Sequence, residues 1–208
     1  MKKTLFALIS LFVISTNVYA EESKILTQHF DLEKKKQFIL EVPVGRIDLQ
    51  TNNSDKIDVR VEITPKNEGD SWFGSDVNLD KFSIEAKNTE SELYLTIDSD
   101  EIEQIWQVTI PKSLALNLEL GVGKVEVSDL ANSATIEVGV GKVLINTALN
   151  DFKAINLDSG VGKTRVKGFE KNIEHNKNVV SSDVKYRGDG QYSIDVEVGV
   201  GDAKVEKR

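Results

Sequence analysis

Cysteine is absent from the 208-residue chain, and basic residues are fewer than acidic ones. Without cysteine the protein has no disulfide, no thiol chemistry and no lipid attachment at a mature N-terminal cysteine. Acidic residues number 34, against 26 lysines and arginines. An acidic surface repels phosphate groups and anionic lipids, so a nucleic-acid partner is not expected. Because disulfides are absent, stability must come from packing and backbone pairing.

Long apolar runs are also missing, except at the start of the chain. Lys2 and Lys3 precede an apolar run over residues 5–14, and Ala20 is followed by two glutamates. This pattern is typical of a secretory signal peptide at 1–20, because a membrane span needs ~18 or more apolar residues. We expect cleavage near Ala20, export to the periplasm or release, and no transmembrane segment in the mature chain. Cleavage removes two lysines and no acid, which leaves a net charge of −10.

A short motif, acid-x-Gly-Val-Gly-base, recurs with a period of about 20 residues. Its first glycine falls at positions 121, 139, 160 and 199, and a fifth copy has proline at 43 instead. The gap between 160 and 199 is close to two periods, so we expect a degenerate copy near residue 180. The gap between 43 and 121 would fit four periods, but the segment between these positions is too irregular for repeats to be assigned in it. Repeats of this length cannot bury a core alone but can stack on their neighbours.

Apolar residues around each motif alternate with polar ones, and the alternation changes phase at the second glycine. Such alternation indicates half-buried strands, and the phase change at glycine indicates a corner. We predict an all-β chain whose parallel strands form a β-solenoid, with an antiparallel meander as the alternative. In one copy, the positions assigned to the interior are Leu118, Leu120, Val122, Val125 and Val127. The predicted structural corners are Gly45, Gly123, Gly141, Gly162 and Gly201.

The segment 21–112 is rich in predicted strands but less regular. Alternating runs occur at 56–64, 81–86 and 92–97, whereas 65–80 is polar and glycine-containing and is expected to be a loop. Trp72 and Phe73 lie in this loop, where they could stack on a sugar or a partner protein, or could cover the core. The regular repeats occupy 113–208, and we expect 21–208 to form one domain.

Charged residues flank each corner in a regular order. In a stack of parallel strands, equivalent positions lie ~4.8 Å apart and form rows. Rows of solvated charges that set register and solubility are the simpler interpretation, and docking of a carbohydrate or polyanion along the basic row is the sharper one. The acidic positions are Glu41, Glu119, Glu137, Asp158 and Glu197. The following positions are Arg46, Lys124, Lys142, Lys163 and Asp202, of which the four basic ones are candidate binding residues.

Four other motifs are weighed and not adopted as sites. The run 160–164 ends like a phosphate-binding loop but lacks its first glycine and a following helix. The acids at 98–103 lack the spacing of a calcium loop. His29 and His175 have no partner pattern, and the tripeptide Arg-Gly-Asp at 187–189 is read as an ordinary turn. We therefore expect no catalytic residue, cofactor or metal.

The region from Val108-Thr-Ile-Pro111 through the Gly-Lys-Val corners resembles the bacterial "putative adhesin" β-repeat family, a domain of unknown function. The likeness covers roughly residues 36–208. Lysine at 124, 142 and 163 departs from the family's usual acidic residue, whereas Asp202 keeps it. The resemblance implies a right-handed β-solenoid with repeats of about 20 residues, no known cofactor and no assigned catalytic residue.

Three functions are compatible with these features. The first is a non-enzymatic scaffold or adhesin-like protein of the cell envelope that presents its repeat surface to a protein or polysaccharide. The second is a polysaccharide-active β-helix enzyme, which would need carboxylates gathered with a basic or metal partner on one concave face. The third is an envelope sensor that binds the outer domain of a membrane protein. We favour the first and expect no enzyme activity.

Overall fold

The computed structural model describes residues 23–66, 77–169 and 172–208, and these residues form an all-β protein. The prediction of an all-β chain is confirmed. Its only helical element in the described residues is the 3₁₀ turn η1 (Leu79–Lys81). The strands are β1 (Lys24–Asp31), β2 (Gln37–Asn52), β3 (Lys56–Pro65), β4 (Glu85–Asn88), β5 (Glu92–Thr96), β6 (Ile102–Pro111), β7 (Ala115–Ser128), β8 (Ala134–Thr147), β9 (Ala154–Val161), β10 (Thr164–Lys167), β11 (Ile173–Lys177), β12 (Ser182–Arg187) and β13 (Ser193–Lys207).

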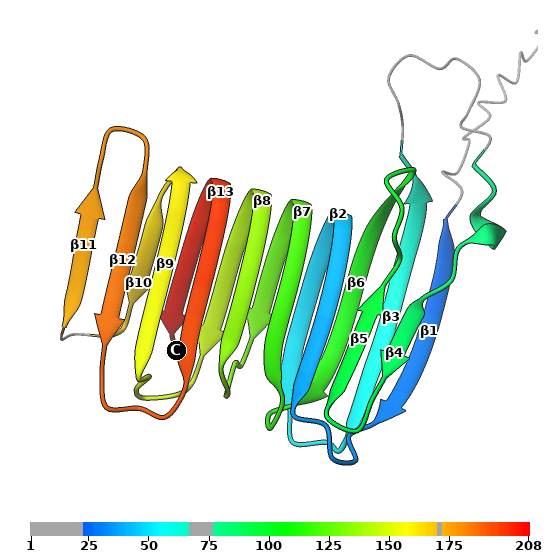
Figure 1. Cartoon of the computed structure of the whole chain (residues 1–208), viewed down its shortest axis with the longest axis horizontal. Helices are drawn as coiled ribbons and strands as arrows, with labels where there is room; N and C mark the ends of the chain where they lie inside the picture. Colours follow the sequence, from blue (N-terminus) through cyan, green and yellow to red (C-terminus); the bar gives the residue numbers. More distant parts are fainter. Residues whose placement is uncertain (1–22, 67–76, 170–171) are drawn as a thin grey trace, which may run out of the picture.

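The strands join in one mixed sheet that does not close on itself (Figure 1). Its order is β1-β3-β6-β2-β7-β8-β13-β9-β12-β11, with β5 and β10 also pairing to β2 and β13, and β4 pairing to β5. The central strands β2, β7, β8, β13 and β9 run parallel, whereas the strands at both ends pair antiparallel. Strands from before and after residue 112 thus share one sheet.

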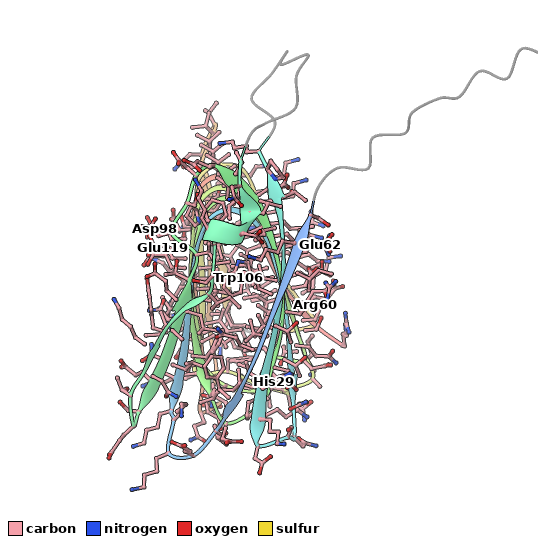
Figure 2. All side chains as sticks on the ribbon, turned by 90° about the vertical axis from the view of Figure 1, so that its right-hand side faces the viewer. His29, Arg60, Glu62, Asp98, Trp106 and Glu119 are labelled. Carbon is pink, nitrogen blue, oxygen red and sulfur yellow. The ribbon has the colours of Figure 1, made fainter. Side chains whose placement is uncertain are left out.

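The sheet is folded over along a line of glycines, so that its two halves form two layers (Figure 2). The four long strands β2, β7, β8 and β13 cross this line, and their second glycines lie in register. A Cβ atom at Gly141 would lie 1.8 Å from the carbonyl oxygen of Gly123, and the φ angle of Gly141 is +157°. Only glycine therefore allows the backbones to approach this closely. The corners at 45, 123, 141, 162 and 201 all have a φ angle between +138° and +157°.

The buried core lies between the two layers, with the alternating apolar side chains of both halves facing each other. Trp106 on β6 lies between the layers and is fully buried (Figure 2). Its indole N–H donates to the side-chain oxygen of Gln104 at 2.9 Å, and the Gln104 amide donates to the carbonyl of Ile97 at 2.9 Å. A buried polar pair inside an apolar core is tolerated because each group has a partner.

The strands are not stacked in the order of the sequence. β13, the last strand, lies between β8 and β9, so the corner at Gly201 is next to that of Gly141 and not at the end of the row. The repeat at Gly162 is split into β9 and β10, which both pair with β13. A solenoid that adds each repeat beside the preceding one therefore does not describe this end of the sheet.

One expectation about the repeat count is wrong, and the spacing left open between 43 and 121 is now explained. No corner lies near residue 180, because β12 pairs antiparallel with β9 and forms a hairpin with β11. Four periods do not fill the gap between 43 and 121 either, because β2 pairs directly with β7. The residues between them instead extend the sheet beyond β2, as β5 and β6 pair with its two halves and β3 and β1 follow. Among the described residues, no helix has the length and apolar character needed to cross a membrane.

Candidate functional site

The predicted basic row exists, but an acidic residue interrupts it. Arg46, Lys124 and Lys142 lie side by side on β2, β7 and β8. Asp202 on the inserted strand β13 comes next, beside Lys142. Lys163 lies beyond it, and its backbone N–H donates to the Asp202 carboxylate at 3.0 Å. The insertion of β13 thus leaves three adjacent cations in place of an uninterrupted row.

Two of these three cations are already paired with carboxylates. Arg46 Nε lies 2.7 Å from Asp48 and its guanidinium is 3.4 Å from Glu126, while Lys124 Nζ lies 2.7 Å from Glu126. The hydrogen bond from Lys124 lowers the pKa of the Glu126 carboxyl, and the hydrogen bond to Asp48 raises the pKa of Arg46. Such a network fixes side-chain orientation and reduces the free positive charge offered to a polyanion.

The acidic positions form a longer row on the outer face of the other layer. Figure 2 shows Glu119 on the opposite side of the molecule from Arg60 and His29. The row is not interrupted, because strand register places the acids of five parallel strands side by side and adds one from the antiparallel strand β12. Its members are, in spatial order, Glu41, Glu119, Glu137, Glu197, Asp158 and Asp183. Glu41, at one end of this row, accepts a hydrogen bond of 2.6 Å from the Tyr94 hydroxyl.

A hollow on the described part of the surface lies on the layer that carries Arg46. It is an open depression of about 600 Å³ that crosses β1, β3, β6, β2 and β7. Two polar side chains of its lining are paired, since His29 Nδ1 lies 2.6 Å from the Asp58 carboxylate. Arg60 donates to the side-chain oxygen of Gln107 at 3.1 Å. Thr109 and Gln50 lie beside Asp58 in strand register and complete a surface of mixed donors and acceptors.

Arg46 is the predicted binding residue that lines this depression. Lys142 and Lys163 lie outside its lining, and Lys124 borders it through Glu126. Trp72 and Phe73 fall outside the described residues, so their predicted role is not tested. The five predicted corners occupy the fold line, as expected.

Sequence reasoning set His29 aside and missed Asp58, Arg60 and Gln107, because these residues lie on β1, β3 and β6 outside the repeats. The alternating polar positions of 56–64 could have indicated an outward polar face. The partners of that face could not be read, since the pairing of β3 with β1 and β6 joins distant segments.

A second correction concerns the valine between the two glycines. Val122, Val140, Val161 and Val200 were expected to face the interior, yet each is exposed by 47% to 49%. They lie in register across β7, β8, β13 and β9 and, with the half-buried Val44 of β2, form a line along the fold edge. We call these five residues the valine line. The chain turns within this corner, where the valine and the first glycine lie outside the buried alternation, so the valine side chain points away from both layers.

The remaining motifs have structural explanations. The Arg-Gly-Asp turn at 187–189 is held by Asp151, which accepts the Tyr186 hydroxyl and, at 2.9 Å, the backbone N–H of Asp189. The run 160–164 continues from β9 into β10 and not into a helix. His175 Nε2 is 3.1 Å from the Ser182 hydroxyl. Within the described ranges, no group of three or more histidines and carboxylates has the arrangement of a metal site.

Comparison with known families identifies the domain. A family model for the N-terminal domain of toast_rack (DUF2154) matches residues 15–167. The chain belongs to this family. The match to the toast_rack N-terminal domain ends at Lys167, so β11, β12 and the inserted strand β13 lie beyond it. The family match confirms the resemblance to an adhesin-like domain of unknown function.

Two crystal structures of bacterial proteins are similar to this toast_rack domain. One is described as a "putative cell adhesion protein" from Clostridium sporogenes ATCC 15579, with 16% identity, a TM-score of 0.49, and coverage of 90% of this chain and 100% of that chain. The other is described as a "putative adhesin" from Bacteroides fragilis NCTC 9343, with 12% identity, a TM-score of 0.24, and coverage of 89% and 97%. No curated protein matches the chain.

Proposed function

We propose that this toast_rack domain is a non-enzymatic binding protein of the cell envelope, and that the depression around Arg60 and Gln107 binds a polysaccharide. The supporting observation is the depression itself, an open polar surface whose side chains are held by one another on a rigid sheet. Planar amide, guanidinium and carboxylate groups in fixed positions suit the hydroxyl groups of a sugar polymer. Pre-positioned side chains also lose little conformational freedom on binding.

The arrangement of carboxylates supports binding in preference to hydrolysis. A glycosidase needs a general acid whose pKa is raised so that it is protonated at neutral pH. In the depression, Lys124 lowers the pKa of Glu126, while Asp48 and Asp58 each lie within 2.7 Å of a basic nitrogen. The polysaccharide-active enzyme is therefore the less favoured alternative. An envelope sensor that binds a protein domain would use the same face. A protein interface usually has an apolar centre, and the described lining of the depression has no exposed apolar centre.

The proposed function requires that the protein is exported. The leader pattern at 1–20 lies outside the described residues, so export and a periplasmic or extracellular location rest on the sequence. We also infer a short solenoid-like stack, in which the parallel strands bend at one glycine line and β13 takes a place out of sequence order. Regular spacing of ~4.8 Å across this stack gives a polymer repeated contacts.

A glycan-array experiment with matched variants tests the proposal. The mature protein would be compared with a variant carrying Arg60→Gln and Gln107→Ala inside the depression. Arg165→Gln is the control, because Arg165 lies in the same row of the sheet at its far end, outside the depression. Loss of hydrogen bonds from a charged group and an amide should weaken binding of a glycan about 10- to 100-fold, with the control unchanged.

A second pair of variants separates the depression from the basic row. Lys142→Gln with Lys163→Gln removes cations outside the depression. If this variant alone loses binding, and only to acidic polysaccharides, the basic row is the site and the depression is not. Absence of binding to any glycan would refute the polysaccharide proposal. Release of shortened sugars by the mature protein would instead favour the enzyme.

A further inference from the structure

The valine line is the most continuous exposed apolar feature of the described surface. Its five side chains lie one strand apart, so the line extends ~19 Å at the strand spacing of ~4.8 Å. Glycines on both sides of Val122, Val140, Val161 and Val200 leave no neighbouring side chain that could cover them, whereas Val44 follows Pro43. The line continues toward the turn between β11 and β12, because the backbone N–H of Gly162 donates to the carbonyl of the exposed Val180 at 2.9 Å. Contiguous apolar surface of this kind is characteristic of interaction sites.

Charge of opposite sign lies on the two sides of the line. The acidic residues stand three positions before each valine, on one layer, and the mostly basic residues stand two positions after it, on the other layer. Both rows follow the same spatial order of strands, β2, β7, β8, β13 and β9/β10. Glu119, Glu137 and Glu197 form no ion pair within 4 Å with any described residue. Their charge is therefore available to a partner.

This layout is complementary to itself under one symmetry operation. A two-fold axis parallel to the valine line places the line of one copy on that of a second copy and brings each acidic row opposite the basic row of the other. A two-fold axis across the line would instead place acid on acid. With the first axis, Glu41, Glu119, Glu137 and Asp158 meet Arg46, Lys124, Lys142 and Lys163 of the second copy, while Glu197 meets Asp202. Four attractive contacts and one repulsive contact thus occur on each side.

We propose that the fold edge is a self-association surface, on which two copies of this chain pack valine line to valine line about an axis parallel to the line. This inference does not rest on the proposed polysaccharide binding, although Arg46 belongs to both surfaces, since it lines the depression and also stands in the basic row beside the fold edge. The contact is narrow and smaller than the 1,200–2,000 Å² typical of stable complexes, so the dimer is a weak and reversible one. Charge complementarity fixes its orientation more than its strength.

Analytical ultracentrifugation of the mature protein over a concentration series tests the proposal. We expect a reversible monomer–dimer equilibrium with a dissociation constant in the micromolar to millimolar range. Val122→Ser with Val140→Ser should raise this constant at least tenfold. The matched control is Ile25→Ser with Ile173→Ser, because both isoleucines are exposed but lie on the end strands, away from the valine line. The control should associate as the wild type does.

Charge exchange decides the orientation. Lys124→Glu with Lys142→Glu reverses two charges of the basic row, and Glu119→Lys with Glu137→Lys reverses the two acids that face them in the proposed dimer. Each variant alone should be monomeric, whereas an equal mixture of the two should form a heterodimer at least as readily as the wild type. Lys56→Glu with Lys185→Glu, the same charge change away from the edge, should have a much smaller effect. A wild type that remains monomeric throughout the series, or a mixture that fails to associate, would overturn the proposal.

Discussion

Replacing Gly141 by alanine should destabilise the protein severely, although the change adds a single methyl group. The residue sits on the fold line between Gly123 of β7 and Gly201 of β13. Its new Cβ atom would lie 1.8 Å from the carbonyl oxygen of Gly123, whereas ordinary contact begins near 3.4 Å. β7 and β8 would have to separate at this point, and their ladder hydrogen bonds would be weakened there.

The expected cost can be estimated from two contributions. A side chain held in the sparsely populated region near the φ angle of +157° costs about 1 to 3 kcal/mol. Loss of one or two backbone hydrogen bonds in a buried setting costs about 1 kcal/mol or more each. The total of about 2 to 5 kcal/mol is a large share of the ~5–15 kcal/mol by which folded domains are typically stable.

Urea denaturation followed by circular dichroism measures this difference. Val140→Ala provides the control, because Val140 is the neighbouring residue on the same corner and is half exposed. Its free energy of unfolding should change by less than about 1 kcal/mol. If Gly141→Ala also stays within about 1 kcal/mol of the wild type, the close approach of the strands at the fold line does not require glycine and the reasoning fails.

The core and the tyrosines give two further predictions. Gln104→Leu removes the hydrogen-bond partner of the buried Trp106 indole and of a backbone carbonyl. The free energy of unfolding in urea should therefore fall by about 2 to 4 kcal/mol. The control Gln107→Leu, at an exposed position, should change it by about 0.5 kcal/mol or less. Burial and the hydrogen bond to Asp151 raise the pKa of Tyr186 to about 12. Stability due to the neutral hydroxyl is thus complete below pH ~10 and is lost as the pH rises toward 12. Tyr186→Phe should remove this pH dependence and one high-pKa phenol from the ultraviolet absorbance titration; an unchanged titration would contradict the assignment.

The repeats made the strands and corners readable from the sequence. Period-two alternation identified the strands that became β2, β7 and β8, and the change of phase identified Gly123 and Gly141 as corners. The direction of Val122 was misjudged because the same alternation was continued one residue too far. At a corner, the residue before the second glycine belongs to neither layer, so local periodicity cannot assign it a side.

The order of the strands and most of the candidate site could not be read in the same way. Gly162 and Gly201 carry almost the same motif, so nothing local shows which of them lies beside Gly141. The depression depends on β1, β3 and β6, whose pairing is antiparallel and long-range. Arg46 was found because it belongs to a repeat. His29 was set aside and Arg60 was missed, because only tertiary pairing brings them to the depression.

The central place of β13 has a consequence for the order in which the molecule can fold. β2 and β7 have both neighbours in the central sheet by residue 147, whereas β8 then has only β7, and any chain that ends before residue 193 leaves the facing edges of β8 and β9 without the strand that separates them. Both edges present a glycine corner in the same phase, so a premature β8–β9 pairing is a competing structure that β13 must displace. Completion of the sheet therefore depends on long-range pairing, which is slow compared with local steps and exposes strand edges in the meantime.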